Sequence, residues 1–159
     1  MIAAALAGCG PFGDDGGDGD GAEPAGEEEL LRSGDEICRT AQERVAEVQR
    51  EPPTSRAESV RFARDLIAIF EDEVVQLAAL EPPEEQSADL DRYLDAREEA
   101  IGLLEEGLAA AQENDAEGYA NAQAEVAAGQ VERAELARQV GFTECSAAPL
   151  ATQPQGNAP

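Results

Sequence analysis

Apolar residues recur at spacings of three and four between about Gly34 and Val140. Such spacing puts them on one face of an α-helix and predicts helices separated by short connectors. No alternating pattern typical of a β-strand competes with it, so the fold class is expected to be all-α. The expected helices cover about 34–50, 55–80, 87–113 and 116–140.

Local signals support these boundaries. The pairs Pro52-Pro53 and Pro82-Pro83 end the first two helices, because proline cannot continue a helix. Ser55-x-x-Glu58 is a capping-box pattern that starts the second helix. Asn114-Asp115 provides the turn before the fourth helix. Gly141-Phe142 fits a Schellman cap, in which glycine adopts a left-handed conformation and the next apolar residue packs back on the helix.

Helices of matched length joined by short connectors pack as antiparallel neighbours. We therefore expect an up-down-up-down four-helix bundle over residues 35–145, in which the start of the first helix and the end of the fourth lie together. Cys38 and Cys145 occupy those two places and are predicted to form a disulfide. The bond would contribute on the order of 4 to 5 kcal/mol by the chain-entropy relation. Two free buried thiols are the alternative.

Composition excludes several chemistries. The chain of 159 residues carries a formal charge of −24, every one of its eleven basic residues is Arg, and it has no His or Trp. Without His or Lys it can build no His-dependent nucleophile, His-bearing zinc site, Walker phosphate loop or Schiff base. Phosphate backbones repel so acidic a protein, so nucleic acid is not an expected partner. We expect no enzymatic activity and no cofactor.

The N-terminus carries a processing signal. Residues 1–8 are a short apolar run that ends at Cys9, after which the composition changes to Gly, Asp, Pro and Glu. Leu6-Ala7-Gly8-Cys9 resembles the lipobox of bacterial lipoproteins, which are cut before a cysteine that carries lipid. The resemblance implies that residues 1–8 are the end of a truncated signal peptide and that Cys9 is lipidated. A chance match at a frayed N-terminus is the alternative.

Two segments outside the bundle are predicted to be disordered. Residues 9–34 are a Gly- and Asp-rich tether with too few apolar residues to offset the entropy of ordering, and residues 146–159 form a similar tail. The layout as a whole resembles small lipid-anchored helical proteins of high-GC Gram-positive bacteria. That resemblance implies export to the outer face of the cell membrane and brings no activity or site residue with it.

Acidic residues line the third predicted helix. Converging carboxylates bind divalent cations, whereas dispersed ones keep a protein soluble. The solvated face is the favoured interpretation, so no metal site is assigned, and a face that attracts a basic peptide is a third reading. The weak metal candidates are Asp91, Asp95, Glu98, Glu99, Glu105 and Glu106.

Three other features bear on the surface. Glycines in the third and fourth helices indicate close helix approach, with a ligand groove as the sharper alternative. Arg133 falls on an apolar line and is expected to extend to the rim of the core. Tyr93 and Tyr119 are expected to cover opposite ends of the core with their hydroxyls in water.

These observations predict a lipid-anchored, extracytoplasmic and non-enzymatic binding module. Its expected partners are the membrane, through the lipid on Cys9, and an envelope protein or basic peptide. A solute- or cation-binding lipoprotein that uses the acidic face of the third helix is the alternative from another class.

Overall fold

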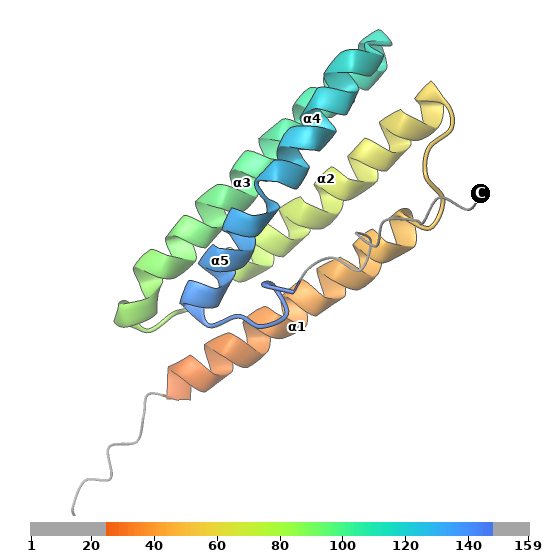
Figure 1. Cartoon of the computed structure of the whole chain (residues 1–159). Coiled ribbons are helices and arrows are strands. Elements are labelled where there is room, and N and C mark those ends of the chain that lie inside the picture. The colour runs from red at the N-terminus through yellow and green to blue at the C-terminus, as the bar shows by residue number, and fades with distance from the viewer. Residues whose placement is uncertain (1–24, 148–159) are drawn as a thin grey trace, which may run out of the picture.

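The computed structural model describes residues 25–147, and every regular element within them is a helix. The predicted lipobox, most of the predicted tether and most of the C-terminal tail lie outside the described residues. Figure 1 shows successive helices running antiparallel, with α4 and α5 following one another as the fourth rod. The all-α bundle is therefore confirmed. The helices are α1 Ala25–Val48, α2 Arg56–Ala78, α3 Glu84–Glu113, α4 Ala116–Ala128 and α5 Gln130–Val140.

The first helix begins earlier than predicted. Residues from Ala25 onward are helical, so the part of the predicted tether between Ala25 and Gly34 was wrongly assigned. The cause is tertiary: Leu30 is only 3% exposed and belongs to the core, and Leu31 packs against the same cluster. Acidic residues in the first turn add a favourable interaction with the positive end of the helix dipole.

Helix α2 begins at a variant of the predicted capping box. The Ser55 side chain accepts a hydrogen bond from the backbone N–H of Glu58 at 3.3 Å. The Glu58 carboxylate accepts from the backbone N–H and the hydroxyl of Thr54, each at 2.8 Å, one residue before the position that the motif predicts. These hydrogen bonds lower the pKa of Glu58 to about 2, chiefly through the Thr54 backbone N–H.

Helix α5 ends in the predicted Schellman motif. Gly141 has a φ of 102°, which only glycine adopts readily. Its N–H donates to the Arg138 carbonyl at 3.1 Å, and the N–H of Phe142 donates to the Ala137 carbonyl at 2.9 Å. The chain reverses here and directs Phe142 into the core.

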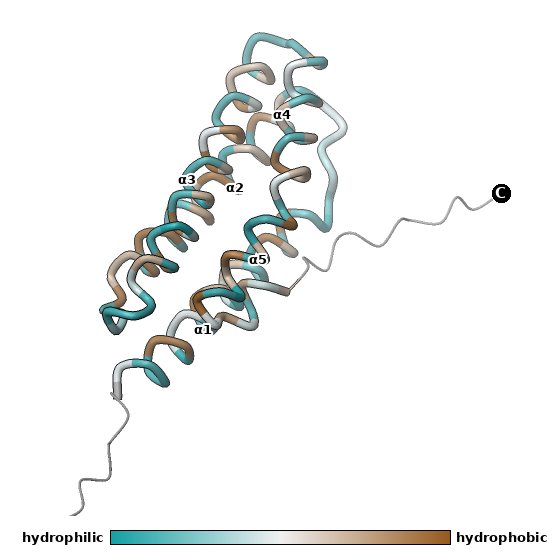
Figure 2. The backbone as a smooth tube through the Cα atoms, turned by 60° about the vertical axis from the view of Figure 1, so that its left-hand side comes forward, coloured by the Kyte–Doolittle hydropathy of each residue, from teal (hydrophilic) through white to brown (hydrophobic). Residues whose placement is uncertain are grey.

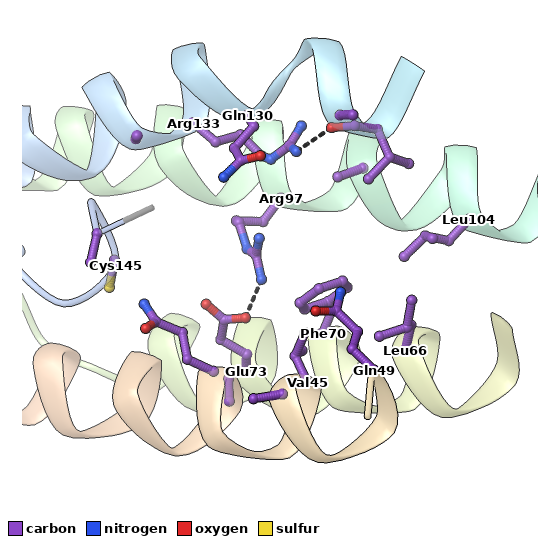
Figure 3. A pocket seen from close by; sticks show the side chains of 18 of the residues that line it. Val45, Gln49, Leu66, Phe70, Glu73, Arg97, Leu104, Gln130, Arg133 and Cys145 are labelled. Atoms are coloured by element: carbon purple, nitrogen blue, oxygen red, sulfur yellow. Dashed lines mark hydrogen bonds and ion pairs between the residues drawn. The ribbon is translucent and has the colours of Figure 1, made fainter. Parts of the chain in front are cut away.

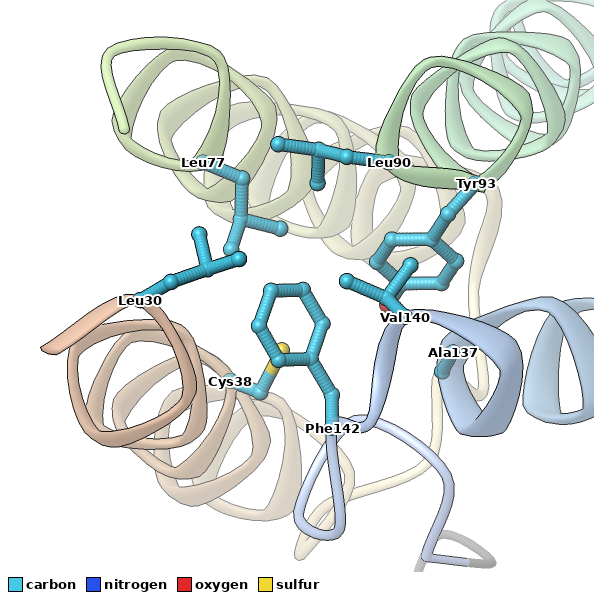
Figure 4. Packing of buried hydrophobic residues seen from close by; sticks show 8 residues of the cluster. All are labelled: Leu30, Cys38, Leu77, Leu90, Tyr93, Ala137, Val140 and Phe142. Carbon is cyan, nitrogen blue, oxygen red and sulfur yellow. The ribbon is translucent and has the colours of Figure 1, made fainter. Parts of the chain in front are cut away.

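Two apolar clusters fill the bundle, and Figure 2 shows hydrophobic residues spaced along each helix between hydrophilic ones. In the first cluster Phe142 points between α1, α2 and α5 (Figure 4). Its ring meets Tyr93 edge to face, with centroids 6.2 Å apart. Tyr93 is 2% exposed, so the expectation that its hydroxyl reaches water was wrong. The second cluster contains Ala41, Val45, Leu66, Ile67, Ile69 and Leu104.

The bundle is not closed all the way round. Helix α1 packs along α2, and within residues 25–147 its backbone contacts no other helix. Residues 141–147, here called the C-terminal strap, cross from the end of α5 to α1. The Asp35 carboxylate accepts from the backbone N–H groups of Thr143 and Glu144 at 2.8 and 2.9 Å. The strap thereby links α1 to the fourth rod at one end only.

Candidate functional site

A cavity of about 300 Å³ lies where the bundle is open, with α1 on one side and the α4–α5 rod on the other. Helices α2 and α3 contribute the rest of the wall, and the strap reaches it through Cys145. This volume is at the lower end of the range of small-molecule pockets, roughly 300 to 1,000 Å³. Most of the wall is apolar, including Ala41, Val45, Phe62, Leu66, Phe70, Ala100, Leu104 and Val126.

A buried ion pair spans the cavity. Arg97 of α3 donates to the carboxylate of Glu73 on α2, and the two side chains are only 13% and 5% exposed (Figure 3). The Arg97 guanidinium also lies over the ring of Phe70, 4.5 Å from its centroid, in a cation–π contact. Burial raises the pKa of the Glu73 carboxyl, and the charge and hydrogen bond of Arg97 oppose that shift.

The disulfide lies against this pair. Cys38 Sγ is 3.6 Å from Glu73 Oε1, a van der Waals contact, because a disulfide sulfur carries no proton to donate. The Cα atoms of Cys38 and Cys145 are 5.1 Å apart, within the usual range for a disulfide. The bond therefore joins α1 to the strap at the end of the bundle where the predicted topology placed both cysteines.

Arg133 forms part of the opposite wall. Its Nη2 donates to the backbone carbonyl of Val126 at 2.5 Å, across the one-residue break between α4 and α5 at Gly129. The side chain is partly buried, and burial together with the nearby charge of Arg97 lowers its pKa. Arg133 was expected to extend to the rim of the core. Its guanidinium instead folds back onto the Val126 carbonyl beside the cavity.

Two buried hydrogen-bond donors of residues in this wall have no acceptor within residues 25–147. The Nε of Arg97 and the Nε2 of Gln123 are buried and have no partner among the described residues. Among residues 25–147, Glu73 is the one carboxylate that lines the cavity, against the two guanidiniums of Arg97 and Arg133. The wall is therefore positive by one charge, inside a chain whose formal charge is −24.

The acidic residues predicted as weak metal candidates do not form a site. All six are exposed along α3. Within residues 25–147 no three Asp, Glu or Cys side chains come close enough together to hold a metal ion. The six are Asp91, Asp95, Glu98, Glu99, Glu105 and Glu106. Cys9, the predicted lipidation site, lies outside the described residues and stays a prediction.

One of the glycines, Gly107, serves helix packing, whereas a Cβ at Gly102 would meet nothing within 4 Å. A Cβ at Gly107 would be 3.2 Å from the Cβ of Ala122, so this glycine lets α3 and α4 approach closely. A second cavity, of about 270 Å³, lies at the α3 and α4–α5 seam beside Gly129, so the alternative of a groove on this side stays a prediction. Tyr119 is partly buried, and burial raises the pKa of its phenol.

The ion pair of Glu73 and Arg97 was not predicted from the sequence, although the sequence contains a pattern that indicates it. Glu73 continues the line of Phe70 and Leu77 at spacings of three and four, as a single charge within an apolar stripe of α2. Arg97 interrupts the line of Tyr93 and Ala100 on α3 in the same way. Two opposite charges that each interrupt a core stripe on neighbouring helices are candidates for a buried pair.

No protein-family model, curated protein or solved structure matches the chain. None of the helices in the described part of the chain is long and apolar enough to cross a membrane.

Proposed function

We propose that the protein is a non-enzymatic binding module that holds a small ligand in the cavity between α1 and the α4–α5 rod. The observation that carries the proposal is the open, mostly apolar cavity of about 300 Å³ with the guanidiniums of Arg97 and Arg133 in its wall. Buried polar groups are almost always hydrogen-bonded. Arg97 Nε and Gln123 Nε2 are covered in this structure, so a ligand would reach them only after their side chains shift.

The residues around the cavity favour binding over chemistry. General acid–base and nucleophilic catalysis need a titrating pair or an activated nucleophile. In this wall the carboxylate of Glu73 is held by Arg97, and Cys145 is in a disulfide. The phenol of Tyr93 has a pKa raised by burial, so it is a poor proton donor at neutral pH.

A cavity-filling variant tests the proposed site. Ala134 lines the cavity on α5, and Ala134→Phe places a ring in it. Ala124→Phe is the matched control, because Ala124 is exposed on α4. We expect the ligands found in a thermal-shift screen of decyl acids, alcohols and amines to stabilise the wild type and Ala124→Phe. At 100 times its dissociation constant a ligand adds about 2.7 kcal/mol.

The same ligands are expected to give no shift with Ala134→Phe. Equal shifts in all three proteins would place binding outside the cavity and contradict the proposal. A screen in which no compound shifts the wild type would contradict it as well.

We also propose that lipid on Cys9 anchors the module at the outer face of the cell membrane. The proposal is supported by the lipobox-like Leu6-Ala7-Gly8-Cys9. Two or more acyl chains on one residue give stable membrane anchoring. Expressed in a bacterium behind a complete export signal, the protein is expected in the membrane fraction with an acylated mass that begins at Cys9. Cys9→Ser is expected to release it and the neighbouring Gly10→Ser to leave it bound; an unacylated wild type would refute the anchor.

A further inference from the structure

We infer that the ligand of the cavity is an amphipathic anion, an organic acid whose carboxylate is held by Arg97 and Arg133 and whose apolar tail lies along the helix walls. The inference rests on the proposed function and adds the chemical class of the ligand. Three observations support it: the sign of the charge in the wall, the guanidinium of Arg133, and the apolar surface beside it.

The charge of the wall selects an anion. Glu73 neutralises one of the two guanidiniums, and the other has no carboxylate partner lining the cavity. Figure 3 shows Arg133 above Arg97 on the opposite side from Glu73. The two guanidiniums also interact electrostatically. Burial lowers the pKa of Arg133, and the charge of Arg97 lowers it further. The charges of Glu99 and Glu132 act on Arg133 from outside the cavity, but neither carboxylate lines it, so an anion placed in the cavity beside both guanidiniums is favoured.

The donors have the geometry that a carboxylate uses. A guanidinium carries five N–H groups in a planar fork that matches a carboxylate. Arg97 has a buried Nε–H with no acceptor, and the Nη2 of Arg133 donates to the Val126 carbonyl. The amide of Gln123 adds another unpartnered donor from α4. Because Arg97 Nε and Gln123 Nε2 are covered, an acid would bind Arg133 first and would reach those two donors only after their side chains shift.

The apolar part of the cavity wall favours a ligand that carries an apolar tail. Residues of the second core cluster, among them Val45 and Leu66, face the same cavity as the arginines. Apolar area removed from water contributes about 25 cal/mol per Å². A small inorganic anion would leave this surface unused, and a metal ion would meet a single carboxylate and two positive charges. A carboxylic acid with an alkyl or aromatic body uses both parts of the wall.

Matched probes test the inference. Decanoate, decan-1-ol and decylamine share one tail and differ in the head group, and each is titrated by calorimetry below its aggregation concentration into the full chain with its disulfide oxidised. We expect decanoate to bind at least tenfold more tightly than decan-1-ol, and decylamine not to bind. The acidic surface of the protein repels decanoate in bulk, so a preference for it reports the cavity.

Two substitutions locate the head group. Arg133→Gln is expected to weaken decanoate binding at least tenfold and to leave decan-1-ol unchanged. Arg138→Gln is the control, because it removes the same charge from the exposed face of α5, where Arg138 pairs with Glu135. Glu73→Gln removes the carboxylate that competes for Arg97 and is expected to tighten decanoate binding about tenfold.

The outcomes separate this inference from the proposed function. Equal affinities for decanoate and decan-1-ol, abolished by Ala134→Phe, would overturn the anion and keep the cavity as the binding site. Decanoate binding that Arg133→Gln leaves intact would overturn the inference as well. If none of the probes binds, or if binding survives Ala134→Phe, both proposals fail.

Discussion

Replacing Gly34 by Ala is expected to destabilise this protein, although the same change stabilises most helix interiors. Gly34 lies within α1, where glycine costs about 1 kcal/mol relative to Ala. A Cβ at this position would, however, lie 2.5 Å from Cζ and 2.8 Å from Cδ1 of Phe142. The Phe142 ring is 1% exposed and packs edge to face on Tyr93, so it has little room to move.

The magnitude follows from the two ways in which the methyl can be accommodated. Overpacking strain costs about 1 to 3 kcal/mol. Expelling the Phe142 ring would forfeit about 1.5 to 3 kcal/mol of burial and about 0.5 to 1.5 kcal/mol from its pairing with Tyr93. After the gain in helix propensity of about 1 kcal/mol, the less costly of the two, overpacking, leaves a net loss of up to about 2 kcal/mol in the free energy of unfolding.

Urea unfolding of the oxidised protein, followed by far-ultraviolet circular dichroism, measures this loss. Gly102→Ala is the matched control, because Gly102 lies within α3 and a Cβ there would meet nothing within 4 Å. It is expected to gain up to about 1 kcal/mol. Phe142→Leu should cost less when it is combined with Gly34→Ala than when it is made alone. A Gly34→Ala protein that gains as much stability as Gly102→Ala would refute the placement of Phe142 over α1.

Three further predictions concern the disulfide, the buried pair and a helix cap. Reducing the Cys38–Cys145 bond, which closes a loop over a sequence separation of 107, should lower the free energy of unfolding in urea by about 4 to 5 kcal/mol; an unchanged midpoint would contradict it. Glu73→Leu should cost about 3 to 5 kcal/mol by leaving Arg97 unpaired, and adding Arg97→Met should recover most of that loss; additive losses in thermal unfolding would count against the pair. Because the folded-state pKa of Glu58 is about 2, its contribution is present above the unfolded pKa of about 4.3 and is lost as the pH falls toward 2. The stability of Glu58→Gln should therefore fall less steeply over this range, and parallel pH profiles would refute the cap.

Helix positions and helix ends could be predicted from the sequence because their causes are local. Ser55 caps α2 and Gly141 ends α5 through backbone geometry that a few neighbouring residues determine. The pairing of Cys38 with Cys145 follows from topology, because antiparallel rods of matched length bring the first and last ends together. Short-range rules were sufficient for each of these features.

The start of α1 could not be predicted in this way. The segment that contains Leu30 is acidic and glycine-rich in composition, and it orders because that leucine finds a place among residues far along the chain. The same holds for the strap, whose attachment to Asp35 joins residues more than 100 positions apart. Composition indicates the entropic cost of ordering a segment but does not reveal a distant contact that offsets that cost.

The cavity could not be predicted either, because a stripe of apolar residues looks the same whether it faces a helix or a void. Val45 on α1 and Val126 on α4 fit the expected seam of a closed bundle. They line a cavity instead, since the strap joins α1 to the fourth rod at one end of the bundle. The position of the gap depends on that long-range link.

The buried pair has a cost that bears on its role. Replacing an ion pair of this kind by apolar residues of similar volume is often neutral or stabilising. Glu73 and Arg97 therefore contribute little that leucine and methionine could not, and Arg97 carries in addition a buried Nε–H without a partner. A ligand carboxylate beside Arg97 and Arg133 would add stability that rises with the logarithm of its concentration above the dissociation constant.

The double variant Glu73→Leu with Arg97→Met separates the two roles. We expect it to fold with a stability close to that of the wild type and to have lost its preference for decanoate over decan-1-ol. Loss of the preference without loss of stability would mean that these charges serve recognition, because the fold does not require them. A double variant that unfolds would instead make the pair a structural element, and the anion would then have to be recognised by Arg133 and Gln123 alone.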